Sequence, residues 1–491
     1  MQGLQDWGLE AQRFSARCAG RHRDILAVEG GLDRGGLVGP GRVKAAPAQA
    51  VDDGWPQPGG PGAEAGRLFG RALPGGDIAH ELSVGPQGGE GVQDWHRVGI
   101  LEPMFYPPPL STGEPGSFAR YTFTRRMPVM IDDVIAGNDY PDDIVTALRA
   151  FKAEVVDGVI RPLGEDALDA ERWRVEGAGL FGRPWLDAPW YAAEAFFFRR
   201  LLEATRYFQA GPWQGHDPFG SQKAREMASE AMAQVLADDV FAPGASDAAQ
   251  FGALLRACLA GNRADLSHAI AADAWRAGPS TGVEIVVDET AAAWRLVSPA
   301  GGRIDVIVDN AGIELMRDLL LVAFLLERDA GLRMTLHVKS HPMFVSDATA
   351  ADVEAALARL GAVPDPGPAR AHATLREALN VGRLSQAAHS MWTSCLFFRE
   401  MPIDLGADLA QAKAVFIKGD ANYRRLIGDA RWEVTTPLAV ASAGFPAPRI
   451  AVRTLKSDPL VGLPPGLVAR LDAEDAQWRI NGRRGVVQVG L

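Results

Sequence analysis

Short apolar runs that alternate with helical segments constrain the fold of this chain most strongly. Continuous apolar runs, rich in β-branched residues, occur at 304–308, 333–338, 413–418 and 449–454. Helical patterns separate or follow them at 315–328, 350–360, 371–380 and 421–428. Buried strands joined by helices are typical of a parallel sheet that is covered by helices on both faces. From about residue 281 to 491 we therefore predict an α/β domain with a parallel or mostly parallel sheet.

The segment from about 104 to 280 is predicted to be a helical domain. Ile144, Leu148, Phe151 and Val155 recur at helical spacing on one face of a single segment. Similar patterns continue through 193–208, 221–241 and 248–261. The densest apolar run of the chain, 319–326, is too short to cross a bilayer, so we expect no membrane association.

Residues 1–103 have a different composition from the rest of the chain. Roughly a fifth of them are glycine, against about 7% in an average protein. They show no sustained apolar period, and such a segment buries too little apolar surface to offset the entropy of ordering. We expect either a disordered extension or translated upstream sequence, with the native start then at Met104.

The net charge and the positions of the cysteines argue against some kinds of binding partner and structural site. The net charge of -11 argues against a nucleic-acid-binding surface as the main function. Cys18, Cys258 and Cys395 lie far apart, which argues against a disulfide framework or a structural zinc site. No signal peptide is visible at the N-terminus, so a cytoplasmic location is expected. No obligate protein partner is indicated.

Polar and charged side chains follow each of the four predicted strands. Asp309 and Asn310 follow the first, and Asp347 comes a few residues after the second. Lys418 and Asp420 follow the third, and the last leads into "RTLK", ending at 456. Ligands bind beyond the carboxyl ends of the strands in open α/β sheets, so four such ends predict one site.

The residue types at these strand ends suit a metal ion and an anion. Asp309, Asn310 and Asp347 offer hard oxygen donors without a thiolate, which favours Mg²⁺ or Mn²⁺. The donors suited to an anion are Lys456, Arg424, Lys418 and Asn422. A metal beside cations is typical of a phosphate-ester site.

Each of these residues also has a purely structural alternative. Asp309 and Asn310 could form a turn or cap a helix, and Asp347 could cap the helix that follows it. Lys456 could be a solvated surface lysine. Other hydrolase classes lack their motifs, because position 311 is Ala where a haloacid-dehalogenase-type phosphatase needs a second aspartate, and no P-loop or G-x-S-x-G elbow occurs.

Four segments in order, "VDNAGIELMRDL", "HVKSHPMFVSD", "FIKGDANYRRL" and "VRTLKSD", resemble the damage-control phosphatase family (domain of unknown function 89). The subgroup that includes acidic residue methyltransferase 1 is the most similar. Upstream, "WYAAEAFFFRRLL" and "LAGNRADLS" resemble helical-domain motifs of that subgroup, so the resemblance runs from about 117 to the C-terminus. One departure is "KGDAN" where the subgroup often has "KGDLN".

The resemblance implies a helical N-terminal domain on a Rossmann-like three-layer α/β/α domain. It implies a divalent metal, Mn²⁺ foremost and otherwise Mg²⁺, Co²⁺ or Ni²⁺, at Asp309, Asn310 and Asp347. Substrate contacts are implied at Glu314, Asp420, Asn422, Tyr423, Arg424 and Lys456, for small phosphate esters such as fructose 1-phosphate. Catalysis would rest on the three metal ligands and Lys456.

Two other functions remain open from the sequence. One is S-adenosylmethionine-dependent methylation of protein carboxylates, although no glycine-rich loop follows a first strand. The other is a sugar-phosphate binder without catalysis. Phosphate release with and without Mn²⁺, measured beside methyl transfer, separates the three.

Overall fold

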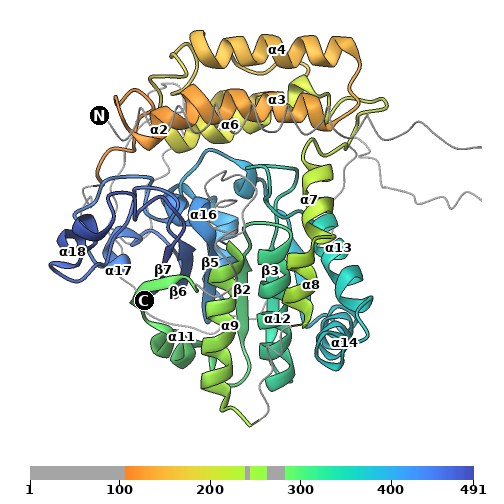
Figure 1. Cartoon of the computed structure of the whole chain (residues 1–491), viewed down its shortest axis with the longest axis vertical. Coiled ribbons are helices and arrows are strands. Elements are labelled where there is room, and N and C mark those ends of the chain that lie inside the picture. The colour runs from red at the N-terminus through yellow and green to blue at the C-terminus, as the bar shows by residue number, and fades with distance from the viewer. Residues whose placement is uncertain (1–105, 238–243, 263–281) are drawn as a thin grey trace, which may run out of the picture. The chain divides into compact units, whose positions relative to one another are not determined.

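The computed structural model describes residues 106–237, 244–262 and 282–491, all within one unit, Met104–Leu491 (Figure 1). The expectations for residues 1–103 lie outside the described residues. The helices before the sheet are α2 (Phe118–Tyr121), the π-helical turn η2 (Thr122–Arg126), α3 (Met127–Gly137), α4 (Asp142–Asp157), α5 (Ala170–Glu176), α6 (Trp190–Ala204), α7 (Gly220–Met227), α8 (Glu230–Ala237) and α9 (Asp247–Asn262).

Seven strands form one sheet, in the order β1-β7-β6-β5-β2-β3-β4. The strands are β1 (Glu284–Asp288), β2 (Arg303–Ile307), β3 (Arg333–His337), β4 (Leu384–Ala387), β5 (Ala414–Lys418), β6 (Arg449–Thr454) and β7 (Arg484–Gly490). β2 to β6 are mutually parallel, whereas β7 pairs antiparallel with β6 and parallel with β1. The chain order reverses between β2 and β5, and ligands bind at such a switch point in open α/β sheets.

Helices cover both faces of the sheet. The remaining helices are α11 (Thr290–Val297), α12 (Ile313–Arg328), α13 (Ala350–Gly361), α14 (Pro366–Asn380), η3 (Ser390–Thr393), η4 (Phe398–Glu400), α15 (Ile403–Leu409), α16 (Gly419–Leu426), α17 (Leu438–Ala441) and α18 (Leu467–Glu474). In β2, Val306 packs into the core with α9, α12, α13 and α14, while Ile307 packs into the opposite core with α15, α16 and α17. Both positions are apolar because both faces are buried. The predicted α/β fold is confirmed.

The helices before the sheet divide between two cores. α2 to α6 share a separate core, whose aromatic residues include Phe196 and Phe197 and which also contains Met343 and Val345 from the loop after β3. These helices lie across the end of the sheet where β5 leads into α16 (Figure 1). α8 and α9 instead pack against α12 in the core of the sheet. The boundary expected near 280 therefore does not coincide with the packing, because the apolar faces of α8 and α9 are buried by the α/β layer.

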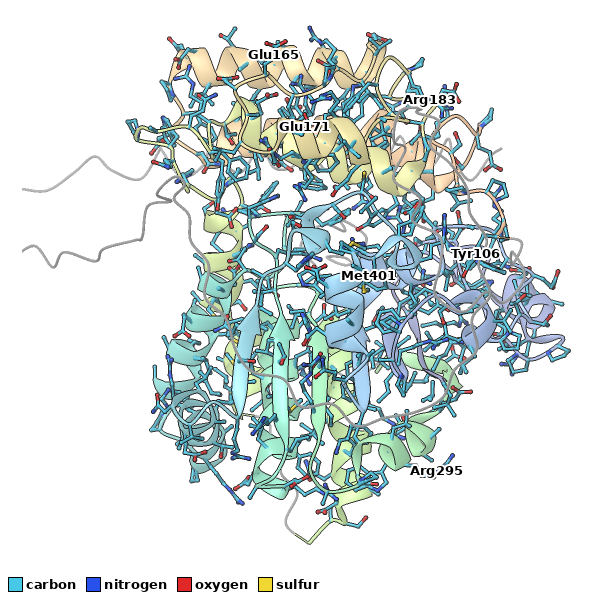
Figure 2. All side chains as sticks on the ribbon, turned by 180° about the vertical axis from the view of Figure 1, so that it is seen from behind. Tyr106, Glu165, Glu171, Arg183, Arg295 and Met401 are labelled. Carbon is cyan, nitrogen blue, oxygen red and sulfur yellow. The ribbon has the colours of Figure 1, made fainter. Side chains whose placement is uncertain are left out.

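Charged side chains cover the outside of this unit. Glu165, Glu171 and Arg183 are exposed on the helical layer, and Arg295 is exposed on α11 at the other end of the sheet (Figure 2). Among the described residues, no helix has the length and apolar character needed to cross a membrane.

Candidate active site

The end of β2 places two polar side chains in a buried position. Asp309 and Asn310 are only 4% and 5% exposed. They do not cap α12, because the residue before that helix is Gly312 and the Ile313 N–H donates to the Glu226 carboxylate over 3.2 Å. Gly419, at the start of α16, has a φ of 80°, and a Cβ there would overlap the Asp309 carboxylate. Glycine at 419 thus allows the end of β5 to pass directly over Asp309.

The loop after β3 carries Asp347 to the same place. Asp347 forms a backbone bridge with Asn310, and the Ala348 N–H donates to the Asp309 carbonyl over 2.8 Å. Phe344 and Val345 both have positive φ, at 49° and 68°. Two consecutive non-glycine residues in this region store backbone strain, which the surrounding packing must offset.

Asp347 does not cap the helix that follows it. Thr349 caps α13, accepting from the Asp352 N–H in a reciprocal capping box. The Lys339 ammonium instead lies 3.1 Å from the Asp347 carboxylate. The capping alternative for Asp347 is therefore wrong.

Negative charge accumulates around Asp309. Burial, with the Glu314 and Asp347 carboxylates close by, raises the pKa of Asp309 well above its usual range. Below this cluster, the buried Lys418 ammonium lies 3.2 Å from Glu314 and 3.1 Å from Asp318. Lys418 thus offsets part of the negative charge that lies beneath the cluster.

The ends of β5 and β6 are joined through Asp420. Its carboxylate accepts from Arg453 Nε over 2.8 Å, from the Ser457 hydroxyl over 2.7 Å and from the Lys456 backbone N–H over 3.2 Å. Burial alone would raise the pKa of Asp420, but Arg453, Arg424 and these bonds outweigh it and lower the pKa. Asp420 is therefore ionised and holds the Lys456 backbone in place.

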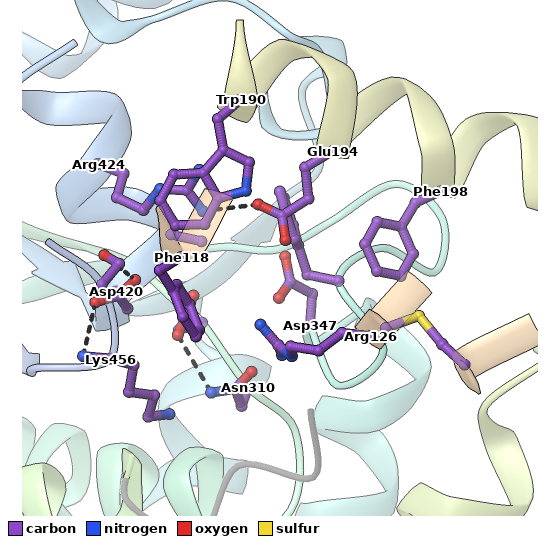
Figure 3. A pocket seen from close by; sticks show the side chains of 15 residues that line it. Phe118, Arg126, Trp190, Glu194, Phe198, Asn310, Asp347, Asp420, Arg424 and Lys456 are labelled. Carbon is purple, nitrogen blue, oxygen red and sulfur yellow. Dashed lines mark hydrogen bonds and ion pairs between the residues drawn. The ribbon is translucent and has the colours of Figure 1, made fainter. Parts of the chain in front are cut away.

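One cavity of about 60 Å³ is lined by Asp309, Asn310, Asp347, Asp420 and Lys456 together. In Figure 3 the Lys456 side chain extends toward Asn310, and Asp347 lies across from it. Lys456 is only 4% exposed, so the surface-lysine alternative is wrong. The cavity walls, from both the sheet edge and the helical layer, are Phe118, Arg126, Met130, Trp190, Glu194, Phe198, Asp309, Asn310, Phe344, Asp347, Asp420, Ala421, Arg424, Lys456 and Ser457.

The donors around Asp309 fit a divalent cation. The buried carboxylates of Asp309, Glu314 and Asp347 repel one another, so a bound cation is favoured among them. Their hard oxygen donors suit Mg²⁺ or Mn²⁺. Beside them, Asn422 Oδ1 is buried without a hydrogen-bond partner in the described structure. Asn310 Nδ2 donates to Glu314 over 2.8 Å, and its Oδ1 accepts from the Ser346 hydroxyl over 2.8 Å.

A metal at this position would require the Asn310 amide to turn. Within the described ranges, no three His, Cys, Asp or Glu side chains form a ligand group by themselves, so the carboxamide oxygen is needed. The Ser346 hydroxyl can accept as well as donate, and it can therefore hold the amide in either orientation.

Comparison with known proteins identifies the family. Residues 122–471 match the model of the damage-control phosphatase ARMT1-like domain. The chain belongs to this family. It is 29% identical to the damage-control phosphatase ARMT1 of Danio rerio over 441 residues, which cover 79% of this chain and 98% of the relative. The rat protein is 30% identical over 434 residues, covering 77% and 97%, and the human protein 28% over 438, covering 78% and 98%.

The solved structures that are similar include a DUF89 family protein from Pyrococcus horikoshii, with 13% sequence identity and a TM-score of 0.41, covering 76% of this chain and 98% of that chain. The resemblance read from the sequence motifs is confirmed by the family match itself.

The residues that the family resemblance implied fall into two groups. Six of them line the cavity: Asp309, Asn310, Asp347, Asp420, Arg424 and Lys456. Glu314, Asn422 and Tyr423 do not. Glu314 lies beneath Asn310, and Asn422 donates to the Val308 carbonyl over 3.1 Å and to Asp309 over 3.4 Å.

Tyr423 and Lys418 face away from the cavity. The Tyr423 hydroxyl donates to Gln488 over 2.9 Å, within the core under α16. Lys418 is bound to Glu314 and Asp318, so it does not offer its ammonium to an anion in the cavity. Direct contact with substrate is therefore not expected from either side chain. For Tyr423, helical period explains this, since successive residues of α16 point in different directions.

Arg424 lines the cavity but is already bound by two carboxylates. Its guanidinium donates to Asp429 over 2.7 and 3.1 Å and to Glu194 on α6 over 2.7 Å. It also lies 3.6 Å from the Trp190 ring centroid. Burial lowers the pKa of a guanidinium, but the two carboxylates outweigh that effect and raise it. Arg424 therefore joins α16 to the helical layer.

The sequence motifs at the strand ends did not reveal the wall that the helical layer contributes. Phe118, Arg126, Trp190 and Glu194 line the cavity from α2, η2 and α6. A sequence signal for one of them exists in "TRRMP", where an arginine pair precedes a proline inside a helical segment. A proline there disturbs the helix and re-aims the side chains before it.

Proposed function

We propose that this protein is a metal-dependent phosphatase that hydrolyses small phosphate monoesters, with sugar phosphates such as fructose 1-phosphate as the substrate class. The observation that carries the proposal is that Asp309, Asn310, Asp347 and Lys456 line one cavity. Membership of the damage-control phosphatase family supports the reaction type. The resemblance to the sugar-phosphate subgroup supports the substrate class.

Asp309, Asn310 and Asp347 would hold the metal, with Mn²⁺ as the proposed ion and Mg²⁺, Co²⁺ or Ni²⁺ as substitutes. The ion would supply polarisation of a phosphoryl oxygen and of the attacking water. An ammonium near a dication is repelled unless an anion lies between them. The placement of Lys456 beside Asn310 therefore supports a bound phosphoryl group, whose developing charge Lys456 would stabilise.

Asp420 is the carboxylate best placed to orient a substrate hydroxyl or the water. It lines the cavity and is ionised, whereas Glu314 is bound beneath Asn310 and does not reach the cavity. The aromatic walls, Phe118, Trp190 and Phe198, would exclude bulk water from the reacting group.

The proposal is tested by phosphate release from a panel of sugar phosphates and other monoesters. Chelator-treated protein should be inactive, and Mn²⁺ should restore turnover. Asp309→Asn should abolish Mn²⁺ binding and turnover. Asp132→Asn, at an exposed residue of α3, should change neither Mn²⁺ binding nor turnover. Full activity of chelated protein, or methyl transfer from S-adenosylmethionine without phosphate release, would overturn the proposal.

A further inference from the structure

The helical layer places a second cation on the cavity wall. Arg126 ends the π-helical turn η2, and its guanidinium points toward Asp347 and Asn310 (Figure 3). Lys456 enters the same cavity from the end of β6. Two cations from different layers thus approach the carboxylates that would hold the metal.

The local backbone explains why Arg126 is aimed inward. The Met127 N–H donates to the Thr122 carbonyl, a bond that spans five residues and widens the helix. Pro128 follows directly and lies in the first turn of α3. Its ring would clash with the carbonyl of residue 124 in a regular helix, so a wider turn accommodates it. Such π-helical turns occur frequently at functional sites.

An aromatic ring holds the inward side chain. The Arg126 guanidinium carbon lies 5.6 Å from the centroid of the Phe118 ring, itself part of the cavity wall. A guanidinium over a ring face is attracted by the ring quadrupole and keeps its donors directed sideways. Arg125, the preceding residue, is exposed, so only one arginine of the pair faces the site.

With a dication bound, Arg126 and the metal would repel each other unless an anion lay between them. Arg424 is bound by Asp429 and Glu194, so it cannot turn toward a ligand without leaving two buried carboxylates. A guanidinium presents paired donors in a fork that matches two phosphoryl oxygens. The cavity of about 60 Å³ leaves room for a small group beside these side chains.

We infer that Arg126 contacts the phosphoryl group of the substrate, as the guanidinium partner of Lys456 in the anion site. This inference rests on the proposed function and adds a residue from the helical layer to it. Arg126 would bridge two oxygens of a phosphate monoester dianion, or of the inorganic phosphate that is released. The competing explanation is that Arg126 serves only as a counter-ion of Asp347.

The test compares Arg126→Met with Arg125→Met, the adjacent exposed arginine, by calorimetric titration. Mn²⁺ is titrated first, and inorganic phosphate is then titrated into Mn²⁺-loaded protein. We expect Arg126→Met to weaken phosphate binding about ten- to a hundredfold, as for a lost charge-assisted hydrogen bond. Its Mn²⁺ affinity should be unchanged or higher, because a repelling cation is gone. Arg125→Met should match the wild type.

Three results would overturn the inference. Unchanged phosphate affinity in Arg126→Met would remove Arg126 from the anion site. A parallel loss of Mn²⁺ and phosphate would make it a support of the metal position only. Wild-type protein that binds no phosphate with Mn²⁺ present would overturn the proposed function together with this inference.

Arg126→Lys gives a second variant, which retains the charge and the helix. It should have intermediate phosphate affinity and a raised KM with a smaller change in kcat, because an ammonium keeps the attraction but loses the fork. Phosphate affinity equal to that of the wild type in Arg126→Lys would show that the fork is not used and would overturn the two-oxygen contact.

Discussion

Among single residues, Lys456 gives the most direct test of the anion site. Lys456→Met removes the ammonium, while the backbone N–H bond to Asp420 stays. We expect kcat/KM to fall by the contribution of a charge-assisted hydrogen bond, roughly 1.5–3 kcal/mol, or about ten- to a hundredfold. Metal affinity should hardly change, and it could rise as repulsion is removed.

Steady-state kinetics and Mn²⁺ titration measure these two quantities. Lys152→Met is the matched control, since Lys152 pairs with Asp132 on the surface of the helical layer. An unchanged kcat/KM would remove Lys456 from the site. An equal loss of metal and turnover would make it part of the metal position instead.

Gly419 sets the geometry of the metal position without contributing a side chain. Gly419→Ala would place a methyl group where the Asp309 carboxylate lies. The alanine would also have to adopt the positive φ of Gly419, which non-glycine residues rarely adopt. The backbone alone costs about 1–2 kcal/mol. Because Asp309 must move, we expect the free energy of Mn²⁺ binding to fall by more than the free energy of unfolding.

Gly406→Ala is the control for this substitution. Gly406 lies inside α15, where an added Cβ meets nothing within 4 Å. That change should be neutral or slightly stabilising, by up to about 1 kcal/mol. Denaturant unfolding and Mn²⁺ titration on both variants give the comparison, and intact Mn²⁺ affinity in Gly419→Ala would contradict the close approach to Asp309.

At the scale of elements, Arg424 connects α16 to α6. Arg424→Met leaves Asp429 and Glu194 buried without their cation. Breaking a buried ion pair on one side typically costs about 3–5 kcal/mol, so we expect a large loss of unfolding free energy. Asp429 also accepts from the Tyr191 N–H over 3.0 Å, which extends the effect to the start of α6.

Equilibrium unfolding of Arg424→Met and of Arg424→Met with Asp429→Asn separates the two possible roles. A connecting role predicts that the second substitution regains part of the stability, because one uncompensated charge is removed. A substrate contact alone predicts normal stability with reduced kcat/KM. That outcome would restore the role which the family resemblance implied for Arg424.

The strands that could be predicted from the sequence are those with a continuous apolar run. The four apolar runs became β2, β3, β5 and β6 with shifts of only a residue or so at the ends. β1, β4 and β7 were not predicted. β4 is "LSQA", in which only Leu384 is buried, and its pairing with β3 at the sheet edge decides its conformation. Edge strands depend on tertiary contacts that a local pattern does not contain.

The same division holds within the site. Asp309, Asn310, Asp347, Asp420 and Lys456 line one cavity, as the sequence predicted, because strand ends in a parallel sheet converge by topology. Sequence patterns did not predict that Arg126, Trp190 and Glu194 line the cavity. These residues come from helices, and the way a helix packs on the sheet edge is not encoded in its local sequence. Tyr423 was misplaced because a motif identifies a segment, whereas helical rotation decides which of its side chains face the cavity.

At the scale of the whole molecule, the site lies where the sheet edge meets the helical layer. The α/β layer supplies the acidic cluster, and the helical layer supplies Arg126 and the aromatic walls. Lys339 and Lys418 offset part of the buried negative charge, yet burial and the Glu314 and Asp347 carboxylates still raise the pKa of Asp309. The metal-free fold therefore carries an electrostatic cost that a bound cation would relieve.

This cost predicts opposite effects of one substitution in two conditions. Asp309→Asn replaces an ionisable carboxyl of the cluster by a neutral amide at nearly constant volume. Without metal, we expect the variant to be at least as stable as the wild type, because burial and the Glu314 and Asp347 carboxylates disfavour an ionised side chain at this position. With Mn²⁺ at about a hundred times its Kd, the wild type should gain about 2.7 kcal/mol by mass action, and the variant should gain little.

Denaturant unfolding of both proteins, in chelator and in Mn²⁺, measures the four stabilities. Asp132→Asn, at the exposed residue of α3, should follow the wild type in both conditions. An equal Mn²⁺-induced gain in Asp309→Asn would mean that the ion binds elsewhere in the folded protein. A strongly destabilised metal-free variant would mean that the Asp309 carboxylate supports the fold itself. The predicted crossing of the two stabilities requires both that the carboxylates repel and that the ion binds among them.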